Sequence, residues 1–448
     1  MIVLFAQNQF PTDQVARALL WEGFKTAHYQ FERSLRELTL PQDLDKAVLI
    51  AQTPGIVGIG ERTSEARSLL GDKAHLLVCA PSLAEVERRA LIESGADTIV
   101  VPRTSSVEHV SERITAELIL QENGNLTSFG SLHGATKVMR GLYSEIEILA
   151  GLNDSILILG ETGTGKELIA REIHRRSKRP EPFLKLNCAE FSPELLRSEL
   201  FGHAKGAFTG AHQEKAGLMA EAGKGTLFLD EIGEMDIHAQ AMLLQVLEDR
   251  EFRPVGLNKI QKFNARLVLA THRNLEQMVE HGKFRRDLYA RIYDFKLEAP
   301  PLRDRRADIP ILVHHFLDRF NKEYPDRVAR IRPEGVDCLF HSEWPENVRQ
   351  LLKVVRKAAV YKGRDDYISV ALLQNEINII SRQKALGARN SASFDPASDK
   401  FHDAIRNMQM AYLTAVLDQA NGNKEAAIEM SGLGRSRFYE LLKKLEIR

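Results

Sequence analysis

The chain contains 448 residues, of which 44% are hydrophobic and 27% are charged. This length exceeds that of one ordinary domain and suggests about three domains, and the composition is that of a folded globular protein, which excludes an intrinsically disordered chain. Because the formal net charge is zero, no global basic field indicates a nucleic-acid binder, so any such function must be local.

The cysteines and the apolar stretches indicate the compartment. Cys79, Cys188 and Cys338 lie far apart and form no Cys-x-x-Cys pair, which fits a reducing compartment and argues against a disulfide framework or a structural zinc site. The opening "MIVLFAQNQF" is too short and lacks the basic start of a signal peptide. No apolar stretch approaches the ~20 residues that cross a bilayer. We expect a cytoplasmic protein with no membrane partner.

Residues 1–118 alternate short apolar runs with helix-like segments. The runs cover 2–6, 47–51, 75–80 and 97–102, and the segment "SLAEVERRALIESG" lies between the last two. Short buried strands that alternate with helices imply a parallel α/β layer. The spacing and the ending "ESGADTIVVP" resemble a response-regulator receiver domain, which implies a flavodoxin-type fold; an unrelated α/β domain is the alternative.

The receiver family needs an acidic pair after the first strand, an acceptor Asp after the third and a Lys at the end of the fifth. The corresponding stretches here read "FAQNQF", "LIAQTPG" and "IVVPR", with no carboxylate between Val48 and Ile59 and with Val101 in place of the Lys. Without clustered carboxylates, nothing holds a divalent cation or accepts a phosphoryl group. We expect a degenerate receiver that does not use phosphate, followed by a polar linker over residues 119–128.

A phosphate-binding loop follows the next buried strand. "SILILG" (155–160) leads into "GETGTGKE" and then into the helix-like "LIAREIHRR", which is the strand–loop–helix context of a P-loop. The glycines let successive backbone N–H groups turn toward the β- and γ-phosphates of ATP, and Lys166 would place its ammonium between them. Glu167 stands where Ser or Thr is usual, so a hydroxyl for Mg²⁺ must come from Thr164 or water. The predicted segment is Gly160, Glu161, Thr162, Gly163, Thr164, Gly165, Lys166 and Glu167.

An acidic pair ends a second buried strand in "GTLFLDEI" (225–232). Phosphoryl transfer needs a carboxylate at the metal and a group that orients the attacking water. Asp230 suits the first task and Glu231 the second. The alternative is that the two carboxylates only solvate the end of a strand, and the P-loop upstream argues against this alternative.

Residues 202–211, "GHAKGAFTGA", contain six Gly or Ala residues. Such a stretch is neither a well-packed helix interior nor a strand, so it predicts a loop that exposes Phe208 and Thr209. A flexible surface loop without a partner is one interpretation, and a protein-contact loop is the other.

Seven motifs in this region recur in the same order in one family. "GETGTGKE", "LNCAEF", "GAFTGA", "LFLDEIGEM", "GKFRRDLYARI", "PPLRDRRADI" and "WPENVRQL" resemble the sigma-54-dependent transcription activators, which are AAA+ ATPases. The resemblance covers about residues 129–370. It implies an AAA+ P-loop NTPase domain over 129–380, with a helical lid over about 300–380.

The resemblance also assigns roles. It implies that Asp230 coordinates Mg²⁺, that Glu231 activates water and that Asn187 is a polar switch holding this Glu. Arg285 and Arg291 match arginine fingers acting on a neighbouring subunit, although two solvated helix-face arginines are the alternative. Further implied sites are the adenine pocket at Leu132, His133 and Gly134, the lid sensor Arg349, and the sigma-54 contact at Gly206, Ala207, Phe208, Thr209, Gly210 and Ala211.

Two positions depart from the family pattern. His272 follows Thr271 where Asn is usual, and its imidazole can still donate a hydrogen bond at the nucleotide site, with a charge that varies with pH. Glu346 in "WPENVRQ" replaces a usual Gly, which predicts a shifted lid turn.

The last part follows a Ser/Ala/Pro/Asp-rich linker at 382–400 and covers 401–448. Residues 401–420 predict an amphipathic helix, a core or dimer seam, through Ile405, Met408, Tyr412, Leu413 and Val416. Two helices around Gly432–Gly434 then resemble a Fis-type helix-turn-helix, with simple packing as the alternative. The candidate DNA contacts are Arg435, Ser436, Arg437 and Tyr439 for base edges and Lys443 and Lys444 for phosphate. Glu440 replaces a usual basic residue, which predicts an unusual target sequence.

The sequence therefore predicts an activator with three domains. Its dimers would bind enhancer-like upstream DNA, assemble into a hexameric ring and use ATP and Mg²⁺ to remodel the sigma-54 RNA polymerase closed complex. A regulator that binds nucleotide only as a ligand is the first alternative, which the Asp230–Glu231 pair disfavours. A generic AAA+ chaperone is the second, which "GAFTGA" and the terminal helix-turn-helix disfavour.

Overall fold

The structure is a computed structural model, in which Met1–Gln374 form one compact unit and Asn375–Arg448 a second. No helix among the residues whose placement it describes is long and apolar enough to cross a membrane. The described residues are 2–7, 12–22, 24–31, 44, 46–50, 59–71, 74–80, 85–100, 107–122, 128–207, 213–363, 365–390, 409–410, 413, 416–417, 420 and 423–444.

The N-terminal part is a five-stranded parallel sheet with the order β2-β1-β3-β4-β5. This is the order of doubly wound sheets of the flavodoxin type. All four apolar runs predicted as strands are confirmed, whereas β2 was not predicted because its sequence "TAHYQF" lacks an apolar run and it lies at the sheet edge. The elements are β1 (Ile2–Gln7), α1 (Thr12–Trp21), β2 (Thr26–Phe31), β3 (Lys46–Ile50), α2 (Ile59–Leu70), β4 (His75–Cys79), α3 (Glu85–Glu93), β5 (Thr98–Val100) and α4 (Val107–Glu122).

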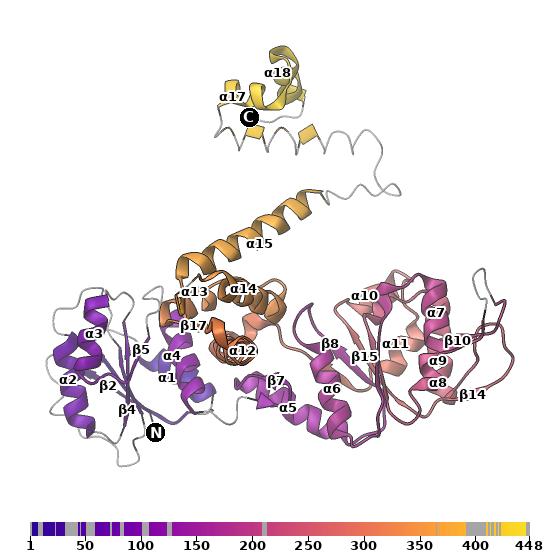
Figure 1. Cartoon of the computed structure of the whole chain (residues 1–448), viewed down its shortest axis with the longest axis horizontal. Helices are drawn as coiled ribbons and strands as arrows, with labels where there is room; N and C mark the ends of the chain where they lie inside the picture. The colour runs from indigo at the N-terminus through magenta and orange to yellow at the C-terminus, as the bar shows by residue number, and fades with distance from the viewer. Residues whose placement is uncertain are drawn as a thin grey trace. The chain divides into compact units, whose positions relative to one another are not determined.

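A second parallel sheet follows, with the strand order β16-β8-β15-β12-β9. Its strands alternate between two buried faces: Ile156 and Ile158 of β8 pack with α5 and α6, whereas Leu157 packs with the core on the opposite face. Figure 1 shows α5 and α6 on one side of β8 and β15, and α9, α10 and α11 on the other. The elements are β8 (Ile156–Leu159), β9 (Phe183–Asn187), β12 (Thr226–Asp230), β15 (Arg266–Thr271), β16 (Lys296–Glu298), α5 (Lys137–Ala150), α6 (Lys166–Arg176), α7 (Pro193–Phe201), α8 (Leu218–Glu221), α9 (Ile237–Asp249), α10 (Leu275–Glu280) and α11 (Arg286–Ile292).

This topology brings the sequence motifs together. The carboxyl ends of parallel strands meet at one edge of a sheet, where open α/β folds bind their ligands. The P-loop follows β8, Thr271 ends β15, Asp230 ends β12 and Asn187 ends β9, and these four strands are neighbours in that order.

The lid covers this edge with helices. Asp308 fixes its start, because the carboxylate accepts hydrogen bonds from the backbone N–H groups of Ala135 and Thr136 at 2.7 and 3.0 Å and from the Thr136 hydroxyl at 2.9 Å. The short elements beside it are β6 (Ser128–Phe129) and β7 (Leu132–His133). The lid contains the 3-10 helix η4 (Leu302–Asp308), α12 (Ile309–Glu323), α13 (Pro333–Phe340), α14 (Asn347–Tyr361), β17 (Arg330–Ile331), β18 (Tyr367–Ile368) and the start of α15 (Val370–Asn390).

The predicted contact loop rises from a short ribbon. Strand β10 (Gly202–His203) pairs antiparallel with β11 (Lys215–Ala216), so the segment between them leaves and returns at the same place. Gly206 and Ala207 belong to its described part, whereas Phe208, Thr209, Gly210 and Ala211 lie outside the described residues. Another ribbon pairs β13 (Glu251–Phe252) with β14 (Gln261–Lys262).

The second unit contains the two predicted C-terminal helices, α17 (Lys424–Ser431) and α18 (Arg435–Lys444). Phe438 of α18 is fully buried, and the described residues Leu413 and Val416 of the predicted amphipathic helix pack in the same core. The other predicted seam residues, Ile405, Met408 and Tyr412, lie outside the described residues. Val101, which stands where the receiver family has its Lys, also lies outside the described residues.

Candidate nucleotide-binding site

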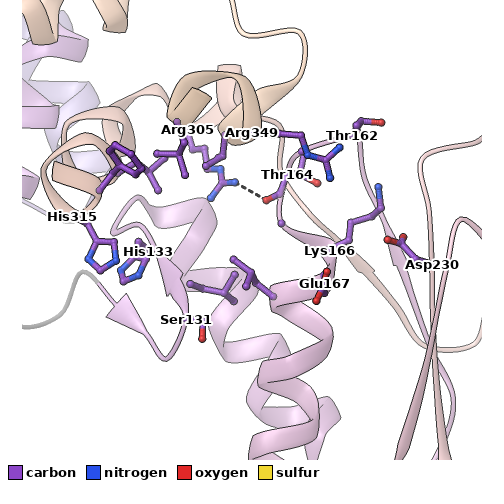
Figure 2. A pocket seen from close by; sticks show the side chains of 18 of the residues that line it. Ser131, His133, Thr162, Thr164, Lys166, Glu167, Asp230, Arg305, His315 and Arg349 are labelled. Atoms are coloured by element: carbon purple, nitrogen blue, oxygen red, sulfur yellow. Dashed lines mark hydrogen bonds between the residues drawn. The ribbon is translucent and has the colours of Figure 1, made fainter. Parts of the chain in front are cut away.

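A cavity of about 750 Å³ lies between the sheet edge and the lid. One end is polar and is lined by residues 162–167 of the P-loop with Asn187, Asp230 and Glu231. Figure 2 shows His133 and His315 at the end away from Lys166 and Asp230. Apolar side chains of Leu132, Leu312, Phe316 and Leu352 also line the cavity. A cavity of this size, with charged and apolar side chains in its lining, suits a nucleotide.

The P-loop ends in a helix that presents its amino terminus to the cavity. Gly165 has φ 106° and directly precedes α6, whose first residue is Lys166. The Lys166 side chain is 7% exposed, and its amino group donates hydrogen bonds to the carbonyl oxygens of Gly160 at 2.8 Å and Glu161 at 3.3 Å. The unpaired N–H groups of a helix start, together with an ammonium, form an anion-binding site.

The lid touches the P-loop at Gly163. This glycine has φ 79°, and a Cβ atom there would lie 2.1 Å from the carbonyl oxygen of Glu346 and 2.9 Å from Cβ of Arg349. Glu346 itself has φ −105°, a conformation open to any residue, so its backbone accommodates the replacement of the usual Gly. Sequence reasoning missed Asn347, whose amide donates hydrogen bonds to Glu161 Oε2 at 3.1 Å and to the Thr162 carbonyl at 3.0 Å.

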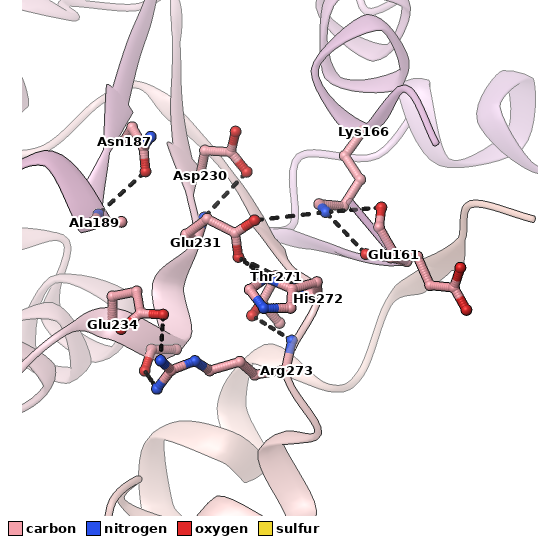
Figure 3. A network of polar contacts seen from close by, with 12 residues as sticks. Glu161, Lys166, Asn187, Ala189, Asp230, Glu231, Glu234, Thr271, His272 and Arg273 are labelled. Atoms are coloured by element: carbon pink, nitrogen blue, oxygen red, sulfur yellow. Dashed lines mark hydrogen bonds and ion pairs between the residues drawn. The ribbon is translucent and has the colours of Figure 1, made fainter. Parts of the chain in front are cut away.

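The acidic pair lies at the polar end (Figure 3). Burial, with the neighbouring Glu231 carboxylate, raises the pKa of Asp230 above its ordinary value. Glu231 is held in the left-handed region at φ 54°. Its Oε2 lies 2.7 Å from Nδ1 of His272, and its Oε1 lies 3.7 Å from Nζ of Lys166. A non-glycine residue in this conformation costs about 1–3 kcal/mol and is typical of functional sites.

Asn187 lines the same cavity but contacts other groups. Its Oδ1 accepts a hydrogen bond from the Ala189 N–H at 3.1 Å, and its Nδ2 donates to Glu190 at 2.9 Å. The Glu231 carboxylate is hydrogen-bonded to His272 and not to Asn187 in this structure. The role of Asn187 as a switch therefore stays a prediction. The sequence analysis placed His272 at the nucleotide site because this residue directly follows Thr271, where the family usually has Asn.

The residues at the polar end fit Mg²⁺ through one carboxylate. Among the described residues, no three His, Cys, Asp or Glu side chains cluster as metal ligands. Both oxygens of Glu167 pair with other side chains, Oε1 with Arg171 at 2.8 Å and Oε2 with Lys185 at 2.6 Å. Asp230 is therefore the carboxylate that would hold Mg²⁺, with the Thr164 hydroxyl in the neighbouring loop. Mg²⁺ typically binds through one or two carboxylates together with substrate phosphates and water.

The predicted arginines divide into two groups. Arg349 lines the cavity, as does Arg305, which sequence reasoning missed among the neighbouring charged residues of "PLRDRRADI". Arg305 is 4% exposed, and its Nη2 donates to the Thr164 carbonyl at 3.0 Å. Arg285 and Arg291 do not line this cavity; Arg285 pairs with Asp287 at 2.7 Å at the surface.

The remaining predicted nucleotide contacts lie around this cavity. Gly134 accepts a hydrogen bond from the Tyr143 hydroxyl at 3.0 Å, beside the lining residues Leu132 and His133. Gly160 and Glu161 line a neighbouring cavity with His272.

The predicted DNA-contacting residues lie on α18 of the second unit. Arg435, Ser436, Arg437 and Tyr439 are exposed. Arg435 pairs with Glu425, and Arg437 pairs with Glu440 at 2.8 Å. Lys443 and Lys444 belong to the same helix, but their side chains are not among those that the structure describes.

Comparison with known proteins identifies the family. The model of the sigma-54 interaction domain matches residues 132–298, and that of the AAA+ ATPase lid domain matches residues 303–389. The transcriptional regulatory protein ZraR of Escherichia coli (strain K12) is 37% identical over 366 residues, which cover 80% of each protein. The Nif-specific regulatory protein of Herbaspirillum seropedicae is 48% identical over 233 residues, which cover 52% of this chain and 43% of that protein.

A solved structure extends the likeness over the whole chain. The crystal structure of NtrX from Brucella abortus in complex with ATP has a TM-score of 0.52 and 27% sequence identity, and the comparison covers 100% of this chain and 99% of that one.

Proposed function

The chain belongs to the family of sigma-54-dependent transcriptional activators, and from this premise we propose that it couples ATP hydrolysis to remodelling of the sigma-54 RNA polymerase closed complex. The observation that carries the proposal is the convergence of Lys166, Asp230 and Glu231 in one cavity that the lid closes at Gly163. A protein that used ATP only as a ligand would not need a carboxylate held beside the phosphate end.

We assign the catalytic roles to side chains of this cavity. Lys166 binds the β- and γ-phosphates, Asp230 holds Mg²⁺, and Glu231 orients the attacking water by accepting its proton. When bound, Mg²⁺ would neutralise the charge that develops on the phosphates. The base would lie beside Leu132, His133 and Gly134. Arg349 of the lid would contact the nucleotide and so make the lid position depend on it.

Assembly completes this site. Arg285 and Arg291 would reach the γ-phosphate of a neighbouring subunit in a ring, a hexamer as in the family, because a planar guanidinium suits the charge of the transition state. Their absence from the lining of their own cavity supports this role.

We assign regulation and DNA binding to the two ends. The N-terminal sheet would be a receiver-like domain that works without phosphorylation, because its sequence lacks the acceptor Asp. The C-terminal helices would form a Fis-type helix-turn-helix that binds upstream DNA as a dimer, with α18 as the recognition helix.

The loop of residues 206–211 would transmit the ATPase cycle to sigma-54. The described strands β10 and β11 flank this loop, and the sequence places neither Phe208 nor Thr209 within a phosphate-binding motif. These two residues should therefore matter for coupling and not for hydrolysis. An aromatic contact anchor typically contributes about 2 kcal/mol or more to an interface.

The test is Thr209→Ala, with Gln213→Ala at the foot of the loop as the matched control. Thr209→Ala should keep ATPase activity and DNA binding and lose open-complex formation, whereas the control should keep all three. Permanganate footprinting of the promoter is run beside phosphate release on the same preparations. Normal promoter opening by Thr209→Ala would show that the loop is not the coupling element, and loss of hydrolysis in an intact ring would place the loop in the active site.

A further inference from the structure

A second cavity lies where the N-terminal domain meets the start of the lid. Its volume is about 210 Å³, enough for several water molecules or one small ligand. Helices α1 and α4 line it from the N-terminal domain, and residues 303–307 of η4 line it from the lid. It contains no residue of the P-loop and neither Asp230 nor Glu231. ATP hydrolysis therefore gives this cavity no task.

Two arginines of η4 line the cavity without an anionic partner. The buried Arg305 donates to the Met139 sulfur and to the Thr164 carbonyl, both at 3.0 Å, while its Nε has no hydrogen-bond partner among the described residues. Asp308 influences the charge of Arg305 but forms no ion pair with it. Arg306 is half-buried, and its side chain makes no hydrogen bond or ion pair with any residue that the structure describes. A guanidinium withdrawn from water without an anion is costly.

A hydroxyl group of α4 lines the same cavity. Thr115 is 5% exposed, and its Oγ1 has no hydrogen-bond partner within the described part of the chain. Buried polar groups are hydrogen-bonded in the great majority of cases. A threonine hydroxyl can donate to an anionic oxygen, so Thr115 and the two arginines offer donors from both sides of the domain boundary.

The carboxylates that line the cavity are already engaged within the protein. Oε2 of Glu22 lies 3.4 Å from Nη2 of Arg140. Oδ1 of Asp304 lies 3.9 Å from Nε of Arg303, and Glu112 also interacts with another group of the protein. The charge that lacks a partner in this cavity is therefore positive.

We propose that this cavity binds a small oxyanion, a ligand with a carboxylate or phosphoryl group, which accepts hydrogen bonds from Arg305, Arg306 and Thr115. Guanidinium groups bind such anions through paired, charge-assisted hydrogen bonds. Because Arg305 also holds the Thr164 carbonyl, the bound anion connects α4 to the P-loop. The N-terminal domain, whose sequence lacks an acceptor Asp, would then respond to a small anion in place of a covalent phosphoryl group.

Equilibrium dialysis of the full chain with labelled inorganic phosphate tests this site. Mg²⁺ and a non-hydrolysable ATP analogue are present at saturation, so that the P-loop does not take up the probe, and chloride keeps the ionic strength constant. The wild-type chain should bind phosphate saturably. Malonate is then added as a competitor. Displacement by malonate at a lower concentration than by unlabelled phosphate indicates a carboxylate ligand, and the reverse order indicates a phosphoryl ligand.

The variants are Arg306→Met and Thr115→Val, neither of which lines the nucleotide cavity. Arg306→Met should weaken phosphate binding by about tenfold or more, because a charge-assisted hydrogen bond is lost. Thr115→Val should weaken it by about threefold without lowering the melting temperature, because the variant removes only a hydroxyl that has no protein partner. Arg17→Met is the matched control, since this exposed residue belongs to α1 and does not line the cavity.

Hydrogen exchange gives a second measurement. Phosphate should slow exchange in α4 of the wild-type chain and of Arg17→Met, and should have no such effect in Arg306→Met. The proposal is overturned if the folded wild-type chain shows no saturable phosphate binding, or if Arg306→Met and Thr115→Val both bind phosphate as tightly as Arg17→Met. Misfolding of one variant, detected by circular dichroism, leaves the other as the test. None of these measurements requires ATP turnover, so their outcome is independent of the proposed function.

Discussion

At the scale of single residues, Glu231 combines backbone strain with defined side-chain partners. Its φ of 54° is maintained at the end of β12, while His272 binds one carboxylate oxygen and Lys166 lies near the other. Phosphates that engage Lys166 would leave Oε1 of Glu231 available to water, while Oε2 would stay with His272. A base oriented by a third group is a recurring arrangement in enzymes.

Glu231→Gln should therefore bind ATP and lose turnover. The amide keeps the size of the side chain but cannot accept the proton of the attacking water, so kcat should fall by about 10²–10⁴-fold. Glu234→Gln is the control, because this carboxylate pairs with Arg273 and does not line the cavity. Phosphate release and ATP affinity are measured on both variants, and turnover near the wild-type rate in Glu231→Gln would contradict its role.

At the scale of elements, the lid and the P-loop fit together only because residue 163 has no side chain. A Cβ atom on Gly163 would lie 2.1 Å from the Glu346 carbonyl, at the start of α14. Gly163→Ala should therefore displace α14 and remove ATP binding at concentrations that saturate the wild type. The measurement is the change in melting temperature on adding ATP, which follows binding to the native state.

The control for this prediction separates backbone strain from the clash. Gly282 has a similar positive φ of 67°, yet nothing lies within 4 Å of a Cβ atom there. Gly282→Ala should cost about 1–2 kcal/mol of stability through its left-handed backbone and leave the ATP-dependent shift intact. Equal ATP-dependent shifts in the two variants would contradict the role of Gly163 in lid packing.

The elements differ in how far the sequence predicts them. The P-loop and the Asp230–Glu231 pair were predictable, because each is a local pattern in which a buried strand leads directly into the functional residues. The contacts of Asn347, Arg305 and His315 were not, because each depends on how the lid packs on the sheet edge. Local composition does not distinguish the buried Arg305 from its half-buried neighbour Arg306.

At the scale of the whole molecule, the N-terminal sheet is packed on the AAA+ domain within the unit Met1–Gln374. The apolar core of β1, β3 and α4 includes Ala135 and Ile311, which belong to the segment after β7 and to the lid. Helix α4 also continues to Glu122, inside the segment expected to be a linker. The N-terminal domain is thus in contact with the lid that covers the nucleotide cavity.

A buried charged contact across this boundary joins Arg113 of α4 to Asp337 of α13, whose Oδ1 also lies 3.3 Å from Nε2 of His341. Nε and Oδ1 are 3.4 Å apart, the side chains are 1% and 8% exposed, and the Arg113 guanidinium lies 5.2 Å from the centre of the Phe340 ring. Removal of one partner from a buried pair leaves an uncompensated charge and costs about 3–5 kcal/mol, whereas an apolar replacement of both is often neutral. The contact between the N-terminal domain and the lid therefore depends on the presence of both Arg113 and Asp337.

Arg113→Met should consequently destabilise the unit by about 3–5 kcal/mol and increase hydrogen exchange in both α4 and α13. The double variant Arg113→Met with Asp337→Leu should recover most of the loss, because no unpaired charge remains buried. Arg17→Met provides the control, since it removes an exposed arginine from the same domain. Chemical unfolding measures the free energy of unfolding. Hydrogen exchange followed by mass spectrometry shows which helices lose protection. If Arg113→Met increases exchange in α4 and leaves α13 unchanged, the contact does not join the N-terminal domain to the lid in solution.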